Sequence, residues 1–402
     1  MIGALILVCC LFVASQPIIN KLAAKNKKIQ VKLIRNLFWY HMFFGLVYYT
    51  YTLFNRSDAI RYYQMASNHW GSWHDAFFTG TGFIEWLAYP WANFLFFNFE
   101  MSMVVFTWMG FWGFVCFYVF FKEQLRTTPR LFGYDLLPLI LFLPNMHFWT
   151  ASIGKGAVIF FGIGMFMYGL SAPSKRWAAL AAGGFFIYMV RPHILIAILL
   201  GMGVGYVLGR EKTALYKKYL VAAVGIVLSF YLYSDVINYL GYDPENFIES
   251  FEDQNVHIAR ELQYSAGSGV NMGGYSLPMK LFTFWFRPLF VDSPNVLGLA
   301  VSFENVLYLF LFLTLFRKDF LRYIVIAPAM VKMAGLVFVS VSISMTYMMS
   351  NLGIIIRQKS QIMYFMLFVV LAFLDWKKVE AYKQYLVKVR RLQVKKEKLK
   401  SI

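Results

Sequence analysis

Long apolar runs recur along the whole chain and constrain its fold more than any other feature. Each run is about 15 to 22 residues long, and an α-helix needs roughly 20 apolar residues to cross a bilayer. The sequence therefore predicts an all-α polytopic transmembrane helical bundle of about 11 spans. The runs cover residues 2–20, 37–54, 101–121, 136–151, 156–171, 178–190, 193–208, 218–238, 296–316, 333–350 and 361–375.

The composition excludes a soluble globular protein. Hydrophobic residues make up 59% of the 402 residues and charged residues only 14%, which is too little polar surface to cover a soluble globule. The cysteines, Cys9, Cys10 and Cys116, lie within apolar runs and indicate neither a disulfide framework nor a metal site. The first run has no basic residue before it and a cluster of them after it, which favours a retained span over a cleaved signal.

The distribution of Lys and Arg predicts the orientation. Residues 21–36 hold six Lys and Arg residues and no acid, so the positive-inside rule places them in the cytoplasm and the N-terminus outside. Alternation of the spans then puts the C-terminus in the cytoplasm, in agreement with ten Lys and Arg residues in the segment 376–402. The net charge of +18 is explained by this orientation, and we expect no nucleic-acid partner.

A single transmembrane domain, residues 1–375, is the simplest division, because no repeat or flexible linker interrupts the chain. Its two long outer loops, 55–100 and 239–295, carry apolar and aromatic residues in patterns that predict interfacial helices. Residues 376–402 are expected to form a basic cytoplasmic amphipathic tail, held on the inner leaflet by anionic lipids.

Four cations stand at the outer ends of predicted spans, most of them close to a Pro or Gly. Isolated charges at membrane depth are costly and persist mainly where they have a partner or a function. Arginine suits phosphate because its planar guanidinium donates two parallel hydrogen bonds and stays ionised when partly desolvated. Any single one could instead snorkel toward lipid headgroups, but as a set they predict a lipid-phosphate-binding site. The four are Lys155, Arg191, Arg287 and Arg357.

Asp58 lies four residues after the second predicted span, at the surface where a lipid-linked substrate would present its head. A carboxylate there can act as a general base toward a hydroxyl, or hold a divalent cation against a phosphate. A salt bridge with Arg61 is the structural alternative. Arg61 and Tyr62 lie within one helical turn of Asp58 and are candidate substrate-binding residues. Glu304, an ionisable residue inside the ninth predicted span, is a third candidate substrate-binding residue.

The histidines show no metal-binding pattern. No two of the six have HxxxH or HExxH spacing, so no residue is assigned to a metal. His193, beside Arg191, could bind phosphate or move a proton and is the second candidate catalytic residue. His147 is expected to be packed or hydrogen-bonded, and His41 lacks a convincing catalytic partner in the sequence.

Five short motifs follow one another along the chain. They are SDAIRYY, LPNMHFWTASIGKG, YMVRPH, FWFRPL after a glycine-rich stretch, and SNLGIIIRQK. Their order, over most of the chain, resembles bacterial polytopic cell-surface polysaccharide enzymes: the exopolysaccharide and O-antigen polymerases and the related membrane glycosyltransferases of the GT-C class. The resemblance implies a sugar donor on undecaprenyl phosphate or diphosphate, a glycan acceptor, and chemistry at the outer face of the bacterial inner (cytoplasmic) membrane. Other polysaccharide-assembly proteins would be further candidate partners.

Carried over by position, Asp58 would match the first-loop acid of the GT-C enzymes, and Arg191, Arg287 and Arg357 the cations that hold the lipid phosphate. The loop lacks the paired DD, DE or ED of the GT-C pattern, which leaves open whether a divalent cation serves as cofactor. We expect an inverting glycosyl transfer in which Asp58 or His193 activates an acceptor hydroxyl. The alternatives are a flippase or transporter of lipid-linked saccharides, which needs a polar path through the bundle, and a membrane acyltransferase with a deep catalytic histidine.

Overall fold

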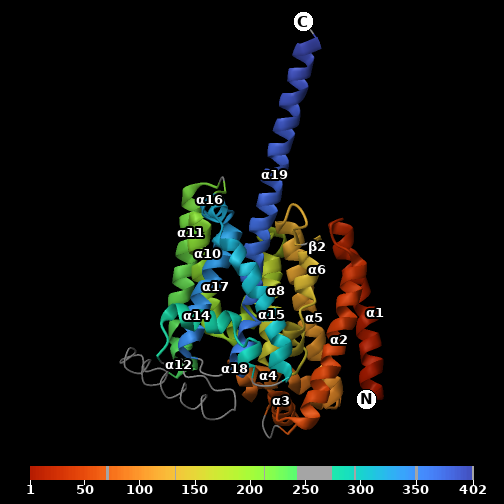
Figure 1. Ribbon diagram of the computed structural model, residues 1–402. Helices are drawn as coiled ribbons and strands as arrows, with labels where there is room; N and C mark the ends of the chain where they lie inside the picture. The colour runs from red at the N-terminus through yellow and green to blue at the C-terminus, as the bar shows by residue number, and fades with distance from the viewer. Residues whose placement is uncertain are drawn as a thin grey trace.

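Helices dominate the computed structural model, which describes residues 1–68, 72–131, 133–211, 213–241, 274–293, 296–348 and 352–400. Most stand side by side in one bundle (Figure 1). The one sheet in this described part is a short antiparallel hairpin of β1 (Arg130–Leu131) and β2 (Tyr134–Asp135). The helices are α1 (Ile2–Lys25), α2 (Val31–Phe54), α3 (Asp58–Ser67), η1 (Trp73–Ala76), α4 (Thr81–Tyr89), η2 (Pro90–Phe94), α5 (Phe99–Gln124), α6 (Leu136–Leu141), α7 (Pro144–Thr150), α8 (Lys155–Leu170), α9 (Pro173–Val190), α10 (Pro192–Leu208), α11 (Leu215–Tyr231), α12 (Tyr233–Leu240), α14 (Leu277–Phe286), η3 (Phe290–Asp292), α15 (Val296–Leu313), η4 (Thr314–Phe316), α16 (Lys318–Ile326), α17 (Ala329–Met348), α18 (Leu352–Lys359) and α19 (Met363–Lys400).

Four of the described helices are long and apolar enough to cross a membrane. They are α1, α5, α15 continued by η4, and residues Ala329–Thr346 of α17. A fifth candidate joins α11 and α12, which bend by 44° at their junction. Shorter apolar helices, among them α8 and α10, belong to the same bundle. The prediction of an all-α membrane protein is confirmed at this level.

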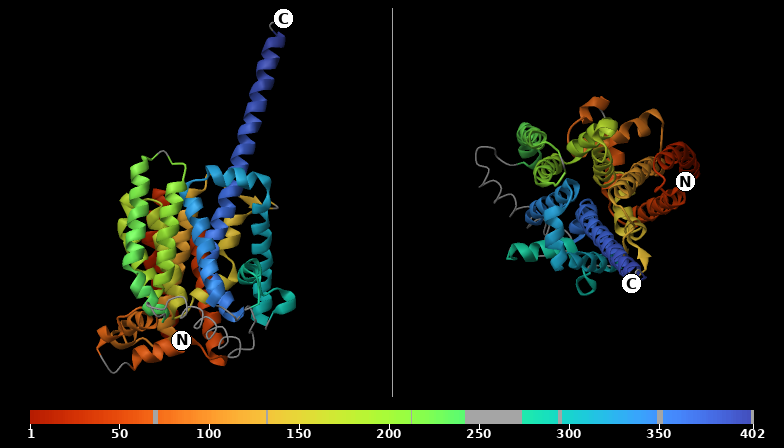
Figure 2. Two further views of the ribbon diagram at one scale, coloured as in Figure 1. Left: turned by 90° about the vertical axis from the view of Figure 1, so that its left-hand side faces the viewer. Right: turned by 90° about the horizontal axis from the view of Figure 1, so that it is seen from above.

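The two chain termini lie at opposite ends of the bundle (Figure 1). The N-terminus lies at the end where α3 and α4 are found, and Figure 2 shows the helices of the first predicted outer loop lying across this end. The C-terminal part of α19 projects from the other end. We call these the α3 end and the tail end.

Residues 55–100 form the helices expected of the first predicted outer loop: α3, η1, α4 and η2. The indole of Trp73 stacks on that of Trp86, with ring centroids 5.0 Å apart, and donates a hydrogen bond to the Trp86 carbonyl. Aromatic stacking thus fixes η1 against α4. Much of the second predicted outer loop, residues 242–273, lies outside the described residues; α14 and η3 follow it.

The centre of the bundle depends on the close approach of α5, α8 and α9. A Cβ atom on Gly164 of α8 would lie 2.7 Å from the Gly113 carbonyl oxygen of α5. One on Gly183 of α9 would lie 2.4 Å from the Phe166 backbone nitrogen of α8. Side chains do not fit at these distances, so glycine lets the helix backbones touch, as small residues commonly do in membrane bundles.

The tail is part of α19, which runs unbroken from Met363 to Lys400. No Gly or Pro occurs between these residues, so nothing in the sequence ends the helix where the apolar run stops. Asp375 holds α19 against the segment that follows α5 at the position where the apolar run stops. Its carboxylate accepts hydrogen bonds from the backbone nitrogens of Arg126 and Thr127 and from the Thr127 hydroxyl. Beyond it, the basic segment expected to be a separate tail helix extends away from the bundle (Figure 1).

We predict that Gly183→Ala destabilises the protein by about 1–3 kcal/mol, because its methyl group would overlap the backbone of α8. Gly184→Ala is the matched control, since a Cβ atom there would meet only the Phe166 ring at 3.8 Å. Thermal unfolding of the detergent-purified variants measures the difference. Equal midpoints for the two variants would contradict the close α8–α9 contact.

Candidate anion-binding site at the α3 end

An ion pair joins α3 to α18. The Asp58 carboxylate, on the first residue of α3, lies 2.6 Å from Nη1 of Arg357 in α18, and the Arg357 guanidinium also lies over the Trp149 ring, 5.8 Å from its centroid. The Ser57 hydroxyl caps α3 by accepting a hydrogen bond from the Ala59 nitrogen. The cap fixes the start of α3 and therefore the position of Asp58. The partner of Asp58 is thus Arg357 rather than Arg61.

Lys155 enters the same group from the first residue of α8. The preceding Gly154 packs against Tyr62 of α3, because a Cβ atom there would lie 3.5 Å from the Tyr62 ring. Gly80, just before α4, approaches from the other side: its Cβ position lies 3.6 Å from Lys155 Nζ and 2.9 Å from the Tyr239 ring. Gly80 also has φ +84°, so a larger residue would be both strained and crowded.

Arg191 stands in the break between α9 and α10, where Pro192 begins the next helix. Its side chain is buried, with 7% of the residue exposed, and within the described part of the chain its guanidinium makes no hydrogen bond or ion pair. The Lys155 ammonium likewise has no such partner among the described residues. Cations that are buried or half-buried without an ion-pair partner are costly. The buried Arg191 and the half-buried Lys155 therefore favour an anionic ligand at this place.

Burial and the positive charge of neighbouring arginines act on both groups, which lie at the ends of helices. Burial, with the neighbouring Arg191 and Arg357, lowers the pKa of Lys155 to about 8, although Asp58 acts in the opposite direction. Burial lowers the pKa of Arg191 to about 10. Both shifts mean that the free protein holds these positive charges at an energetic cost that an anion would relieve.

His193 lies two residues after Arg191, in the first turn of α10. Its ring is 5.8 Å from that of Tyr239, and its charged neighbours are Arg191 and Lys155. Its buried Nδ1 has no hydrogen-bond partner among the described residues. The ring therefore has a nitrogen free for a ligand or a proton.

The sequence did not predict that Gly80 and Tyr239 lie at this site. A glycine next to an aromatic segment is too common a pattern to indicate such a position.

The site is strongly unbalanced in charge. Besides Lys155, Arg191 and Arg357, the Arg61 side chain acts electrostatically on both Lys155 and Tyr62. Asp58 is the carboxylate of this group, and it is half exposed. Several cations facing one acid favour a ligand with more than one negative charge.

Arg287 and Glu304 belong to a second cluster. The Arg287 guanidinium pairs with Asp292, five residues further along the chain. The Lys359 ammonium, which is fully buried, donates to the Arg287 carbonyl at 2.8 Å and to the Asn305 amide oxygen at 2.6 Å. Arg287 therefore has an anionic partner within the protein, unlike Lys155 and Arg191.

The Glu304 carboxylate is also bonded within the protein. It accepts hydrogen bonds from the Asn145 backbone nitrogen at 2.5 Å and from the Tyr308 hydroxyl at 3.2 Å. Asn145 lies in the first turn of α7, which starts at Pro144 and divides the predicted span 136–151 into α6 and α7. Glu304 therefore holds the start of α7 in place. Nothing in the sequence indicated that Lys359, which lies in the same motif as Arg357, belongs to this second cluster.

His41 and His147 form a buried pair, which the sequence did not predict. Nδ1 of His41 in α2 lies 2.8 Å from Nδ1 of His147 in α7, and Nε2 of His147 is 2.7 Å from the Leu141 carbonyl oxygen. His147 stacks flat on Phe114, with centroids 4.0 Å apart. The expected packed and hydrogen-bonded role of His147 fits this position; the sequence did not reveal its partner.

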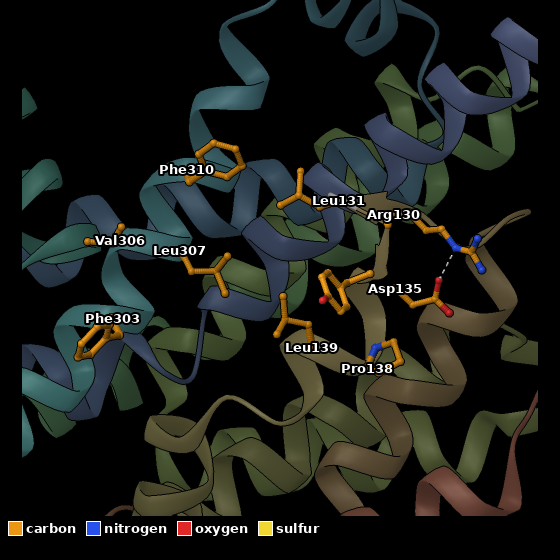
Figure 3. Close-up of a pocket in the computed structure, with 11 residues that line it drawn as sticks. Arg130, Leu131, Asp135, Pro138, Leu139, Phe303, Val306, Leu307 and Phe310 are labelled. Atoms are coloured by element: carbon orange, nitrogen blue, oxygen red, sulfur yellow. Dashed lines mark hydrogen bonds and ion pairs between the residues drawn. The ribbon is translucent and has the colours of Figure 1, made fainter.

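A cavity of about 990 Å³ lies elsewhere, between α15 and the β1–β2 hairpin (Figure 3). Its walls are largely apolar and include Phe303, Leu307 and Phe310 of α15, with the Arg130–Asp135 ion pair at 2.7 Å. None of the cations of the α3 end lines it. Within the described residues no group of three or more His, Cys, Asp and Glu side chains could hold a metal ion.

Comparison of this chain with protein-family models, curated proteins and solved structures finds no match.

We predict that sulfate binding at the α3 end weakens as the pH rises from 7 to 9. Sulfate keeps its charge over this range, whereas Lys155, with a pKa of about 8, loses its proton. Arg191, with a pKa of about 10, stays largely ionised over this range. Isothermal titration calorimetry should show affinity falling several-fold for the natural protein. Lys155→Arg, which stays charged, should remove most of the dependence; an equal fall in this variant would contradict the role of Lys155.

Proposed function

We propose that the protein is a membrane-embedded glycosyltransferase or polysaccharide polymerase that uses a polyprenyl-phosphate- or diphosphate-linked sugar donor. The observation that carries this proposal is a pair of cations without a hydrogen-bond or ion-pair partner among the described residues, the buried Arg191 and the half-buried Lys155, beside the Asp58–Arg357 ion pair. A diphosphate would supply the negative charge that the described residues do not provide. The motifs that resemble the polysaccharide enzymes contribute all four of these residues.

The proposed topology has 11 spans, with the N-terminus outside and the C-terminus in the cytoplasm. The basic residues of 21–36 lie in the last turns of α1, in the connection to α2 and at the start of α2, at the end of α1 opposite to the N-terminus. The basic half of α19 projects from the tail end. The positive-inside rule then assigns the tail end to the cytoplasm and the α3 end to the outer face. In this orientation the site meets the outer leaflet of a bacterial inner membrane, where a lipid-linked donor would present its sugar.

In the proposed reaction an acceptor hydroxyl attacks the anomeric carbon of the donor from the face opposite to the phosphate. The new bond joins the acceptor oxygen to the anomeric carbon, and the bond from this carbon to the phosphate oxygen breaks with inversion. His193 or Asp58 takes the hydroxyl proton. Lys155, Arg191 and Arg357 stabilise the charge that develops on the departing phosphate, and Arg61 and Tyr62 border the sugar. Arg287 is left out of this group, because Asp292 already neutralises it.

We predict that Arg191→Ala lowers glycosyl transfer by about 10²–10³-fold, the usual loss when one group that stabilises a developing oxyanion is removed. Arg56→Ala is the matched control, because Arg56 is an exposed arginine at the same end of the bundle. The assay supplies the protein, reconstituted in liposomes, with a labelled undecaprenyl-diphosphate saccharide and measures released lipid phosphate and lengthened glycan.

Arg191→Lys and thermal unfolding of every variant separate loss of function from loss of fold. Normal turnover in a folded Arg191→Ala variant would overturn the proposed role of Arg191. Movement of the labelled lipid across the bilayer without release of lipid phosphate would instead identify a flippase, the alternative function.

A further inference from the structure

A second cavity, of about 290 Å³, lies at the tail end, away from the proposed reaction site. Two loops form it: the connection between α1 and α2, and the segment that runs from the last turn of α5 toward the β1–β2 hairpin. Four cations line it, namely Lys27, Lys28, Lys122 and Arg126. Among the described residues, none of those that line this cavity is acidic.

Most of these cations have no acceptor within the described residues. The Lys28 ammonium donates to the Leu125 carbonyl at 3.0 Å. The Lys27 and Lys122 ammonium groups and the Arg126 guanidinium make no hydrogen bond or ion pair with described residues. Lys122 is half-buried, so its charge is already partly removed from solvent. An ammonium in this position gains from an acceptor that the described part of the protein does not supply.

The nearby acids are bonded to other groups. Glu123, which follows Lys122, forms a two-point ion pair with Arg176. The Asp375 carboxylate is occupied by the Arg126 and Thr127 backbone and by the Thr127 hydroxyl. Asp135 pairs with Arg130, although it also attracts Lys122 electrostatically. Most of the positive charge of the cavity is therefore left for a ligand from outside the described chain.

The walls of the cavity are held by hydrogen bonds of their own. The Gln30 backbone nitrogen donates to the Tyr118 hydroxyl at 3.0 Å, which ties the α1–α2 connection to α5. The Leu136 nitrogen donates to the Pro129 carbonyl at 3.0 Å, which closes the loop that carries the hairpin. The cations are thus attached to backbone segments that the fold fixes, and the site is formed before a ligand arrives.

The apolar cavity of Figure 3 is lined by the next residues of the same segments. Pro129 and Leu137 line the basic cavity, whereas Arg130 and Pro138 line the apolar one. A ligand with a phosphate and long hydrocarbon chains would match both, but free phosphate would match only the first. Basic pockets between membrane helices at the cytoplasmic side recognise lipid headgroups in this way.

We propose that the basic cavity binds the phosphate-bearing headgroup of an anionic phospholipid, whose acyl chains lie along the apolar cavity beside it. The lipid would tie the α1–α2 connection to the end of α5 at the end of the bundle opposite to the α3 end. This site does not take part in the proposed glycosyl transfer.

The test uses the full-length protein in nanodiscs of phosphatidylglycerol or of phosphatidylcholine. The natural protein should unfold several degrees higher in phosphatidylglycerol. In the double variant Lys28→Gln/Lys122→Gln this gain should be largely lost, and native mass spectrometry should show phosphatidylglycerol retention weakened by about tenfold or more, since each lysine near the lipid surface contributes to attraction. Lys175→Gln/Lys318→Gln is the matched control, because both residues are exposed and lie outside the cavity.

Equal phosphatidylglycerol effects in the double variant and its control would overturn the proposal, as would the absence of any effect on the natural protein. In a further arm the protein in phosphatidylcholine receives inorganic phosphate. A stabilisation by phosphate as large as that by phosphatidylglycerol would overturn the lipid assignment and identify free phosphate as the ligand. Both readouts are independent of transferase activity, so this inference and the proposed function can fail separately.

Discussion

The backbone contact between α8 and α9 is the constraint on which the α3 end depends. The short turn between these helices makes them antiparallel, and glycine at positions such as 183 lets them touch along their length. Lys155 at the start of α8 therefore lies close to Arg191 at the end of α9. Two like charges held together in this way would separate in a looser structure. The packing of small residues in the middle of the bundle thus sustains a concentration of charge at its end.

The bundle carries a different electrostatic arrangement at each end. At the α3 end the buried Arg191 and the half-buried Lys155 and Arg357 come from different helices and converge with one carboxylate. At the tail end the basic residues are mostly exposed and come from neighbouring segments of the chain. The first arrangement suits a ligand that must be held with its charge desolvated, which is how enzymes stabilise a leaving group. The second suits a ligand that stays at the membrane surface. Under the two proposals, one chain would offer phosphate two distinct environments.

The sequence was sufficient to predict the broad fold and many residues of the candidate site. The features that could not be predicted from it have physical causes. Apolar runs of span length predict helices directly, because helix formation in a membrane is a local requirement. Lys155, Arg191 and Arg357 stood out because charges are rare beside such runs. The pairing of Asp58 with Arg357 could not be predicted, since 299 residues separate them and only helix packing brings them together. Arg287 looked equivalent to the other cations because the sequence does not show that Asp292 turns back onto it.

In the proposed glycosyl transfer, the Asp58–Arg357 ion pair would impose an order on events. While the pair is intact, the carboxylate that could accept a proton is neutralised by the guanidinium that could hold a phosphate. A phosphate that draws Arg357 toward itself would leave the Asp58 carboxylate without its cation and open to a second molecule. A protein with the proposed activity would then be inert toward water and acceptor until the donor has arrived. Such a compulsory sequence, donor first and acceptor second, would protect a lipid-linked sugar from wasteful hydrolysis.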